Sequence, residues 1–456
     1  MNRMKTRGSI LVGVLWCMVL LSLLVIGVLH TARMDLIVGK NYGDRVQAHY
    51  LALAGVERAK ALLYQDVVTR EHTSKNHTGT YYDDAKNFKD VALGRGKMRV
   101  FHRASQDDGG AIVYGISDEE SRLDLNTVSA NQLTNLSGMT PDILSAIIAW
   151  RTAATQNPSA GQDNNNTASG GAASDYYMSL RPPYMARNGP YQTVRELLMV
   201  RGVTTDLLLG NDNNQNGFLD ENDEPASQLP PDAKPPQRPN PGWEPLLTVT
   251  DRDKSVDASG KDRLNPQTAD YGALSAIAGV TPEIARAIMS YRNQHQLQNL
   301  DDLMNVTQSQ GATNNANGVN NNNNSGATVI SQDLFEQIAD NFTFANGQQS
   351  DGLVNINTAG LDVLASLPGL DRTLAQAIIN YRKSSGYFDN VAGILKVDRI
   401  TRDIFKQLSP LITARSETFR IICEGKINST GTRQRVEEIV HIGGKDIETL
   451  SYREDL

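Results

Sequence analysis

The sequence contains very little cysteine and histidine. Among its 456 residues there are two cysteines, Cys17 inside an apolar run and Cys423 near the other end of the chain. We therefore expect no disulfide framework. The seven histidines are scattered, and no Ser/His/Asp arrangement, metal-hydrolase spacing or phosphate-binding loop is present. The sequence therefore predicts a protein that is not an enzyme.

Excess positive charge is also absent. The formal net charge is -7, which argues against a surface that coats nucleic acid.

The length predicts about three domains, which is enough for more than one buried core.

One stretch near the amino terminus lacks charge altogether. Residues Ser9 to Leu29 form an apolar run of 21 residues, preceded by Arg3, Lys5 and Arg7. A helix of this length spans the ~30 Å hydrocarbon core of a membrane, and the basic leader places the amino terminus in the cytoplasm. A secretory signal peptide is the alternative, but the run is too long for one and no small-x-small cleavage site follows it.

The helical pattern continues beyond the apolar run. No proline occurs from Thr31 to Leu63, and apolar residues recur there at three- and four-residue steps. Gly39 and Gly43 weaken the pattern locally. We predict one helix from Ser9 to Leu63, ~80 Å long, with half in lipid and half in water.

This amino-terminal stretch resembles the type IV pilin and pseudopilin class. The resemblance rests on a basic leader ending in Gly8, the apolar helix after it, and the Tyr-Leu-Ala-x-Ala-Gly-x-Glu sequence from Tyr50 to Glu57. It implies that a prepilin peptidase cuts after Gly8 and methylates Ser9. The first mature residue in this class is usually Phe, and here it is Ser9.

A second departure from the pilin pattern is Gly13, which stands where the class usually has Glu. In pilins that Glu is implied to pair with the amino terminus of a neighbouring subunit, which offsets the cost of a carboxylate in the bilayer. A subunit without it cannot make the pairing to a subunit above it, which indicates a filament tip. Lack of this Glu is typical of the K-type minor pseudopilin of type II secretion. The alternative is a single-pass anchor with no role in assembly.

Short strands occur on both sides of a long insertion. Met98 to His102 and Ala111 to Ile116 flank a turn-rich segment, and Thr418 to Ile427 and Arg433 to Ile442 form a matching pair at the far end. Isolated hairpins are marginal in water, so we expect one antiparallel sheet packed on the exposed half of the long helix. The predicted fold is α+β, a pilin helix on a small sheet with a large all-α insertion between strands.

The insertion is an internal repeat. Taking Thr127, Thr268 and Thr358 as origins, the same apolar residues, a central glycine (Gly138, Gly279, Gly369) and a final aromatic-Arg pair follow at identical spacing. Each copy predicts a helix capped by the Thr, a turn at the glycine and a second helix, begun by Thr140-Pro141 and Thr281-Pro282 in the first two copies. A second half also repeats, beginning at Tyr191, Leu297 and Phe388. Three low-complexity segments, 155–175, 225–245 and 308–328, are predicted to be exposed loops.

The repeated unit resembles the helix-hairpin-helix family, which usually grips DNA phosphates through a Gly-x-Gly turn. The second glycine is absent from all three copies, and the net charges of 122–151, 261–292 and 351–383 are 0, +1 and 0. The units are therefore poorly equipped to neutralise phosphates, and nucleic acid is not favoured as a partner. K-type minor pseudopilins are similar here too, with hairpin insertions inside a pilin sheet and similar sequences at Asp175 to Tyr184 and Asn188 to Leu198.

One segment has the spacing of an EF-hand calcium loop. Its predicted ligands, in positions one, three, five, seven, nine and twelve, are Asp212, Asn214, Asn216, the Phe218 carbonyl, Asp220 and Asp223, and Gly217 stands at the sharp turn. Few charges and a terminal Asp in place of Glu indicate weak, structural Ca²⁺ binding suited to ~millimolar calcium. The alternative is a solvated Asn/Asp loop. Two other acidic groups, Asp118 to Glu120 and Asp251 to Asp257, are too irregular to assign to a metal.

The sequence therefore predicts a minor pseudopilin at the tip of the type II secretion pseudopilus, anchored in the inner membrane by one span with its carboxyl-terminal part in the periplasm. It would initiate and cap the filament for protein export. The expected partners are other minor pseudopilins, the major pseudopilin and the prepilin peptidase. A DNA-binding competence pseudopilin and a minor pilin of a type IV pilus remain as alternatives.

The sequence also predicts how the chain is divided. The expected segments are a leader (1–8), a transmembrane half-helix (9–29), the rest of the helix with the first strands (30–117), three helical repeats (118–246 with the calcium loop, 247–350, 351–415) and the closing strands (416–456).

Overall fold

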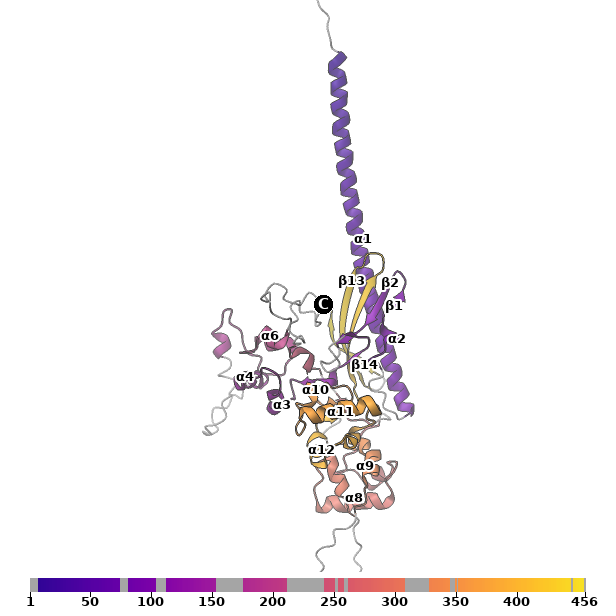
Figure 1. Cartoon of the computed structure of the whole chain (residues 1–456), viewed down its shortest axis with the longest axis vertical. Coiled ribbons are helices and arrows are strands. Elements are labelled where there is room, and N and C mark those ends of the chain that lie inside the picture. Colours follow the sequence, from indigo (N-terminus) through magenta and orange to yellow (C-terminus); the bar gives the residue numbers. More distant parts are fainter. Residues whose placement is uncertain are drawn as a thin grey trace, which may run out of the picture.

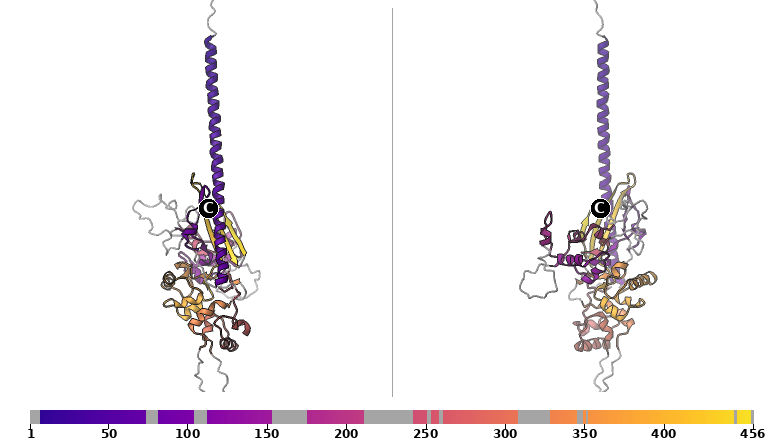
Figure 2. Two further views of the ribbon diagram at one scale, coloured as in Figure 1. Left: turned by 90° about the vertical axis from the view of Figure 1, so that its right-hand side faces the viewer. Right: turned by 60° about the vertical axis from the view of Figure 1, so that its left-hand side comes forward.

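The chain forms a long helix joined to an elongated head, and the described residues cover most of both (Figures 1 and 2). The computed structural model describes residues 7–73, 81–103, 112–152, 175–210, 242–250, 253–257, 261–307, 328–344, 349–350, 352–443 and 446–454. The predicted low-complexity segments lie almost entirely outside these residues. The expected fold class, an α+β fold with a helical insertion between strands, is confirmed.

The amino-terminal helix is longer than predicted. Helix α1 runs without interruption over Arg7–Thr73, 67 residues, and is therefore ~100 Å long. Gly39 and Gly43 do not break it, and among the described residues a Cβ added at either position would have no neighbour within 4 Å outside the helix's own backbone. The cost of a glycine in a helix is only about 1 kcal/mol, which the surrounding helix formers offset.

The sheet is built from both ends of the chain. Its strand order is β1-β2-β12-β13-β14, with the short β5 also paired to β12, and all of its pairings are antiparallel. The strands are β1 (Val91–Leu93), β2 (Gly96–Val100), β5 (Ser117–Asp118), β12 (Thr418–Ile427), β13 (Arg433–Gly443) and β14 (Asp446–Arg453). Because β2 and β5 both pair with β12, the long segment between β5 and β12 is an insertion into one sheet.

The predicted strands were partly wrong. The bounds of β12 agree with the prediction and β13 extends one residue further, but the expected strand over Ala111 to Ile116 is not part of this sheet. Only β4 (Ile112–Val113) forms there, and it pairs with β3 (His102–Arg103) in a separate ribbon. The sequence analysis also missed β1 and β14, which lie at the two edges of the sheet. Edge strands bury little surface, so their apolar signal is weak; most of β14 is exposed.

Helix α1 packs on the sheet through very small residues. Ala48, Ala52 and Ala59 are fully buried on its sheet-facing side. Gly425 of β12 lies so close to the helix that a Cβ there would overlap the Ala48 carbonyl oxygen and lie 2.7 Å from Ala52 N. The backbones of helix and strand are thus in direct contact, and no larger side chain fits between them.

The insertion consists of three units of one design. Unit 1 (123–248), unit 2 (264–342) and unit 3 (354–413) each contain two helical hairpins, and in each the first and last residues pair as parallel strands or as a single bridge. Unit 1 comprises β6 (Leu123–Asp124), α3 (Ala130–Thr134), α4 (Pro141–Arg151), η3 (Val194–Met199), α6 (Thr205–Leu208), η4 (Glu244–Leu246) and β7 (Leu247–Thr248). Unit 2 comprises α7 (Tyr271–Ser275), α8 (Pro282–Gln294), η5 (Leu300–Asn305), α9 (Gln332–Ile338) and η6 (Ala339–Asn341). Unit 3 comprises β10 (Val354–Asn355), α10 (Leu361–Leu364), α11 (Arg372–Ser385), η7 (Val391–Lys396), α12 (Arg402–Leu408) and β11 (Ile412–Thr413).

Short elements connect these parts. They are α2 (Ala85–Phe88), η2 (Glu119–Ser121), and the strands β8 (Asp253–Lys254) and β9 (Gln349–Ser350), which pair with each other. Unit 3 lies next to the sheet, unit 2 lies farthest from the free end of α1, and unit 1 projects to one side (Figure 1).

The predicted caps of the second helices are confirmed, and those of the first helices are wrong. Thr140 and Thr281 cap the second helices, with proline at the first helical position, as expected, and Asp371 takes this place in unit 3. The repeated Thr residues do not cap the first helices, which begin after Ser129, Asp270 and Gly360. Each Thr lies two residues earlier, in the turn that follows the unit's first strand or bridge residue.

Candidate functional site

The free end of α1 is the first candidate site, because it is apolar and is not buried against any other described part of the chain. The large hydrophobic residues from Leu11 to Leu29 are all exposed. The helix is long and apolar enough to cross a membrane by length and composition, and none of its most apolar stretch is buried in the head. Gly8 and Ser9, the predicted processing site, lie in its first turn. This geometry allows one membrane span.

The polar residues of this segment are compatible with lipid. Ser22 donates to the Met18 carbonyl at 2.8 Å and Thr31 to the Gly27 carbonyl at 3.0 Å, so neither hydroxyl is left unpaired in an apolar medium. Gly13 has no neighbour within 4 Å of where a side chain would begin. The position at which pilins usually carry Glu is therefore bare backbone.

The second candidate site is a group of buried carboxylates where the sheet meets the insertion. We call Asp118, Glu119 and Glu120 the acidic junction. The carboxylate of Asp118 is fully buried and accepts hydrogen bonds from Asn355 at 2.9 Å, from Ser416 at 2.5 Å and from Thr358. Burial raises the pKa of Asp118 although these hydrogen bonds act against it. One side chain thus joins β5 to unit 3 and to the start of β12.

Glu119 is the carboxylate of the acidic junction that pairs with arginine side chains. Its carboxylate accepts from Arg420 Nε at 2.5 Å and from Thr248 Oγ1 at 2.5 Å, and Arg122 lies 3.4 Å away. Burial alone would raise the pKa of Glu119, but the guanidinium groups of Arg122 and Arg420 lower it to about 2. Glu119 therefore remains ionised and ties unit 1 to the sheet.

Glu120 completes the junction by accepting from the backbone N-H of Glu417 at 2.8 Å and of Thr418 at 3.3 Å. The hydrogen-bond partners of these acids from other elements lie between 129 and 301 positions away in the chain. The three acids were not assigned a role from the sequence. Their signal was three consecutive acidic residues beside short apolar strands, a pattern that a solvated turn shows equally well.

Within each unit, the repeated Arg has a structural role. Arg292 donates to the carbonyls of Pro266 at 2.9 Å and Ala269 at 2.6 Å. Arg151 makes the same two contacts in unit 1, and Arg382 makes the first of them in unit 3 at 3.1 Å. This Arg fastens the end of the second helix to the loop before the first helix, so it does not project toward a ligand.

A repeated amide joins the two hairpins of each unit. Asn357 accepts from Phe388 N at 2.8 Å and donates to Phe388 O at 2.9 Å. Asn126 makes the same pair of bonds with Tyr191, and Gln267 accepts from Leu297 N at 3.0 Å. The sequence analysis missed these residues, although an Asn or Gln directly before each repeated Thr was a usable signal.

The glycine turns that could grip phosphate are covered by the second hairpin of the same unit. A side chain at Gly138 would meet Leu207 of α6 at 2.6 Å. Beside Gly279 lies Leu334 of α9, and beside Gly369 lies Ile404 of α12. All three turns have positive φ, which explains the glycines by backbone conformation and packing alone.

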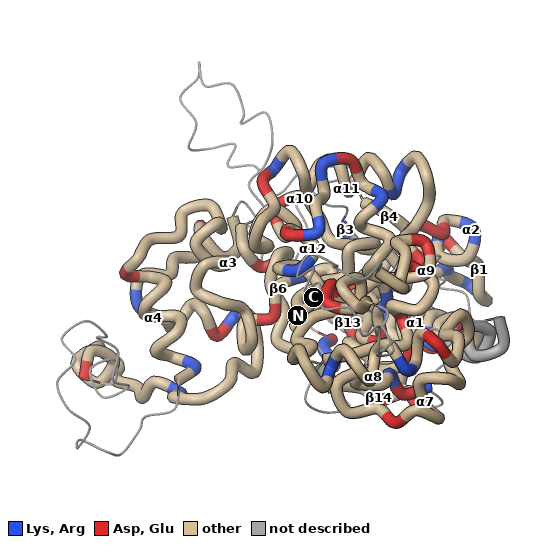
Figure 3. The backbone as a smooth tube through the Cα atoms, turned by 90° about the horizontal axis from the view of Figure 1, so that it is seen from below, with Lys and Arg blue, Asp and Glu red and all other residues tan. Residues whose placement is uncertain are grey.

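Units 2 and 3 meet through charges of opposite sign. Arg402 of unit 3 binds the carboxylate of Asp301 at 2.9 and 3.1 Å, and Lys406 lies 3.3 Å from Asp302. Over the helical units as a whole, both signs of charge are interspersed (Figure 3). The basic residues of α12 are therefore paired with acids of unit 2, although both side chains remain about half exposed.

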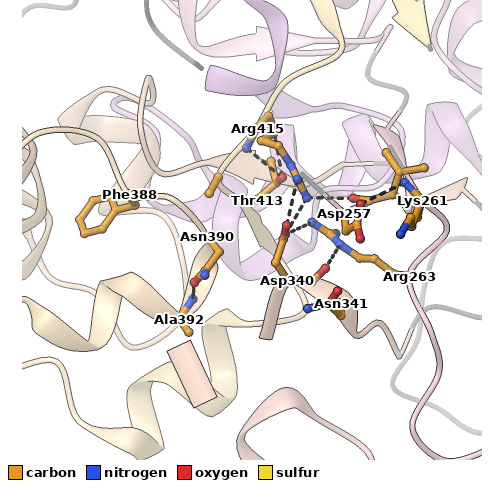
Figure 4. Close-up of polar contacts among 12 residues, drawn as sticks. Asp257, Lys261, Arg263, Asp340, Asn341, Phe388, Asn390, Ala392, Thr413 and Arg415 are labelled. Atoms are coloured by element: carbon orange, nitrogen blue, oxygen red, sulfur yellow. Dashed lines mark hydrogen bonds and ion pairs between the residues drawn. The ribbon is translucent and has the colours of Figure 1, made fainter. Parts of the chain in front are cut away.

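The centre of the contact between units 2 and 3 is apolar and closed. Phe335 of α9 and Phe405 of α12 are fully buried, with ring centroids 5.8 Å apart. Beside them, Asp340 accepts from Arg263 at 3.0 Å and from Arg415 at 2.6 and 3.0 Å (Figure 4). Units 2 and 3 therefore form one lobe, which Arg415 connects to the start of β12.

The predicted calcium ligands from Asp212 to Asp223 lie outside the described residues. The two ends of their segment are fixed: Gly242 is in contact with the Leu208 carbonyl, and Trp243 donates through Nε1 to the Ser137 carbonyl at 2.8 Å. Among the residues that the structure describes, no group of three or more His, Cys, Asp or Glu side chains could hold a metal ion.

These features define an architecture: a long helix with an apolar free end that packs on an antiparallel sheet, and three units of helical hairpins inserted into that sheet. Part of the chain is similar to a secretion protein: residues 121–209 match the family model "Type II secretion system (T2SS), protein K". Residues 349–413, which contain unit 3, match the model of the helix-hairpin-helix motif.

Curated relatives match only short parts of the chain. ComE operon protein 1 of Bacillus subtilis is 41% identical over 71 residues, 15% of this chain and 35% of that protein. The transcriptional accessory protein Tex of Neisseria gonorrhoeae is 44% identical over 54 residues, 12% of this chain and 7% of that protein. The chain thus spans about a third or less of the length of these relatives.

Among solved structures, the crystal structure of the GspK-GspI-GspJ complex from the type 2 secretion system of enterotoxigenic Escherichia coli contains a similar chain. The alignment covers 93% of this chain and 99% of that one, with 10% sequence identity and a TM-score of 0.39. The fold described above rests on the chain's own structure.

Proposed function

We propose that the chain is a minor pseudopilin of the K type that initiates and caps the type II secretion pseudopilus during protein export across the outer membrane. The match of residues 121–209 to the protein K family carries this proposal. The exposed apolar end of α1 and the sheet packed on its other end support it, because together they place a large head on a single membrane anchor.

The proposal assigns a mechanical role to each part. The prepilin peptidase cuts after Gly8, and the apolar helix from Ser9 then moves from the inner membrane into the filament. Gly13 offers no carboxylate to the amino terminus of a subunit above it, which favours a terminal position. The three units form a bulky head on the periplasmic side, and the other minor pseudopilins and the major pseudopilin pack along α1.

This function is tested by purifying the full-length protein from membranes of its source organism. We expect a mature amino terminus at Ser9 and co-purification of subunits that also begin with a pilin-type helix. A protein that keeps residues 1–8 and is recovered without such subunits would reduce the chain to a single-pass anchor. Co-purified subunits of a type IV pilus in place of secretion subunits would identify the third alternative, a minor pilin.

The DNA-binding alternative is supported by the match of residues 349–413 to the helix-hairpin-helix motif. The geometry counts against it in unit 3. There, Arg402 and Lys406 are paired with acids of unit 2, and the turn at Gly369 packs against α12. We expect no salt-dependent retention of duplex DNA by the detergent-purified protein at low salt, and clear retention would favour the alternative.

Calcium binding by Asp212 to Asp223 is the second part of the proposal. The ion would order a segment whose ends are held together at Gly242 and whose ligands are oxygen atoms. Asp212→Ala is expected to lower the melting temperature of the protein in millimolar calcium and to leave it unchanged in chelator, because only the metal-bound state uses this carboxylate. Equal melting of the two proteins in calcium would contradict the site.

A further inference from the structure

A row of three cations crosses the sheet on the face that α1 does not cover. On β12, Ile421, Cys423 and Ile427 are buried, the first two in the core that α1 forms with the sheet, so the alternate residues Glu424 and Lys426 point to the other face. Lys426 stands directly opposite Lys97 of β2 on one side and opposite Arg433 of β13 on the other. We call Lys97, Lys426 and Arg433 the cationic row.

In the neighbouring row, side chains of opposite charge lie opposite one another on adjacent strands, which stabilises a sheet. Glu424 stands between Arg99 and Arg435, and its carboxylate lies 2.9 and 3.0 Å from their guanidinium groups. One buried carboxylate thus serves two arginines. It leaves little charge for Arg433, whose Nε is 3.9 Å away.

The cationic row costs stability in the isolated chain. Like charges directly opposite one another on adjacent strands repel, whereas opposite charges there attract. Lys97 is relieved by Asp90 at 3.0 Å, but Lys426 makes no ion pair within the described residues. The cationic row thus places three cations side by side, with Asp90 next to Lys97 at one end, in a chain whose net charge is -7. Such a local excess of one sign fits an acidic partner.

The position of the row indicates which partner can reach it. It lies at the end of the sheet from which α1 leaves, since Gly425 and Gly96 beside it contact Ala48 and Leu51 of the helix. Just beyond, Leu36, Val38 and Tyr42 of α1 are 75, 61 and 71% exposed. A neighbouring helix lying along this part of α1, on the side of the outer sheet face, would bring its own head to the level of the cationic row.

We propose that the cationic row, with Arg99 and Arg435, is a docking surface for the acidic head of a neighbouring pilin-like subunit. This inference rests on the proposed function, because it assumes that such subunits pack along α1. The carboxylates of the partner would supply the negative charge that the sheet itself lacks. The contact would position the head rather than hold the helices together, which is the role of apolar packing.

Lys426→Glu separates docking from folding. In the isolated protein this change places a carboxylate between Lys97 and Arg433, so the melting temperature is expected to stay the same or rise. In membranes of the source organism, the amount of pilin-like subunits that co-purify with the full-length variant is expected to fall about tenfold, because the partner's carboxylates then meet a like charge. The recovery of the wild-type complex should also decrease with salt.

The matched control is Arg286→Glu, the same change of charge sign at an exposed position of α8. It should leave the recovered subunits unchanged. Equal recovery with Lys426→Glu and Arg286→Glu would overturn the docking surface while leaving the proposed function intact. Failure of the wild-type protein to recover any pilin-like subunit would overturn both. If Lys426→Glu recovers the subunits normally but loses attachment to nanodiscs containing anionic lipid, the surface binds lipid and the inference is wrong.

Discussion

Replacing Gly425 by alanine is expected to detach α1 from the sheet. A Cβ at this position would overlap the Ala48 carbonyl oxygen and lie 2.7 Å from Ala52 N and 2.8 Å from Leu51 Cβ. These are mostly backbone atoms of one helix, which cannot move individually. The whole helix must shift, so we expect a destabilisation of about 3 kcal/mol, at the upper end for overpacking.

Cys423 provides the measurement. Its thiol is buried between the sheet and Gly55 of α1, and burial raises its pKa to about 12, so in the folded state it is both inaccessible and protonated. With Cys17 replaced by serine, Cys423 is the remaining cysteine in the chain. If labelling by a maleimide requires the helix to open, a loss of about 3 kcal/mol accelerates it roughly a hundredfold.

Gly43→Ala is the matched control for this experiment. It lies on the same helix, is exposed and has no neighbour within 4 Å, so the new methyl group only improves helix propensity. Labelling of Cys423 should be unchanged or slower in this variant. If Gly425→Ala were labelled no faster than Gly43→Ala, the close backbone contact would not be what holds the head on the helix.

The second large effect is expected for Glu119→Gln in the acidic junction. The amide keeps the shape of the side chain but removes the charge that neutralises Arg122 and Arg420, both mostly buried. Removing one partner of a buried ion pair typically costs about 3–5 kcal/mol. Trp150 and Trp243 are buried in unit 1, so their fluorescence during urea unfolding reports the loss.

The pH dependence of Glu119→Gln follows from the lowered pKa. The pKa of Glu119 is near its ordinary value of 4.5 when the chain is unfolded and about 2 when it is folded. Its contribution is therefore fully present above pH 4.5 and disappears as the pH falls toward 2, and it amounts to about 3 kcal/mol. The difference in stability between wild type and variant should be constant above pH 5 and shrink below pH 4.

Glu57→Gln is the control for the pH experiment, because Glu57 pairs with Lys60 at 3.0 Å but is 71% exposed. Its effect should stay below about 1 kcal/mol at every pH. A difference between wild type and Glu119→Gln that did not change between pH 6 and pH 3 would show that the charge of Glu119 is not what binds unit 1 to the sheet.

Local sequence patterns predicted the elements that depend on local physics. The uncharged run from Ser9 and the absence of proline as far as Leu63 were sufficient for α1, because helix propensity and apolarity are properties of neighbouring residues. The three-fold spacing predicted the repeated units, and Thr-Pro pairs predicted the starts of α4 and α8. The strands β12 and β13 were predicted as a pair because the turn residues from Asn428 to Thr432 separate them.

Other features had no local signal. The edge strand β14 buries too few side chains to show an alternating apolar pattern. The repeated Thr at 127, 268 and 358 is a residue type that often caps helices, but each lies two residues before the residue that caps the first helix. Asp118 and Glu119 look like a solvated turn, because the partners that bury them, Asn355 and Arg420, are more than 200 residues away. The ligands of the predicted calcium loop lie outside the described residues and stay a prediction.

By itself, the sequence determined a long helix with an apolar free end and three helical repeats, since apolar length, helix propensity and repeat spacing are all local. Only the tertiary structure decided how the parts are joined: α1 against Gly425, unit 1 to the sheet through Glu119, and unit 2 on the basic side of unit 3. The physical reason is that burial turns a charge or a missing side chain into a specific contact, and burial depends on residues far away in the chain.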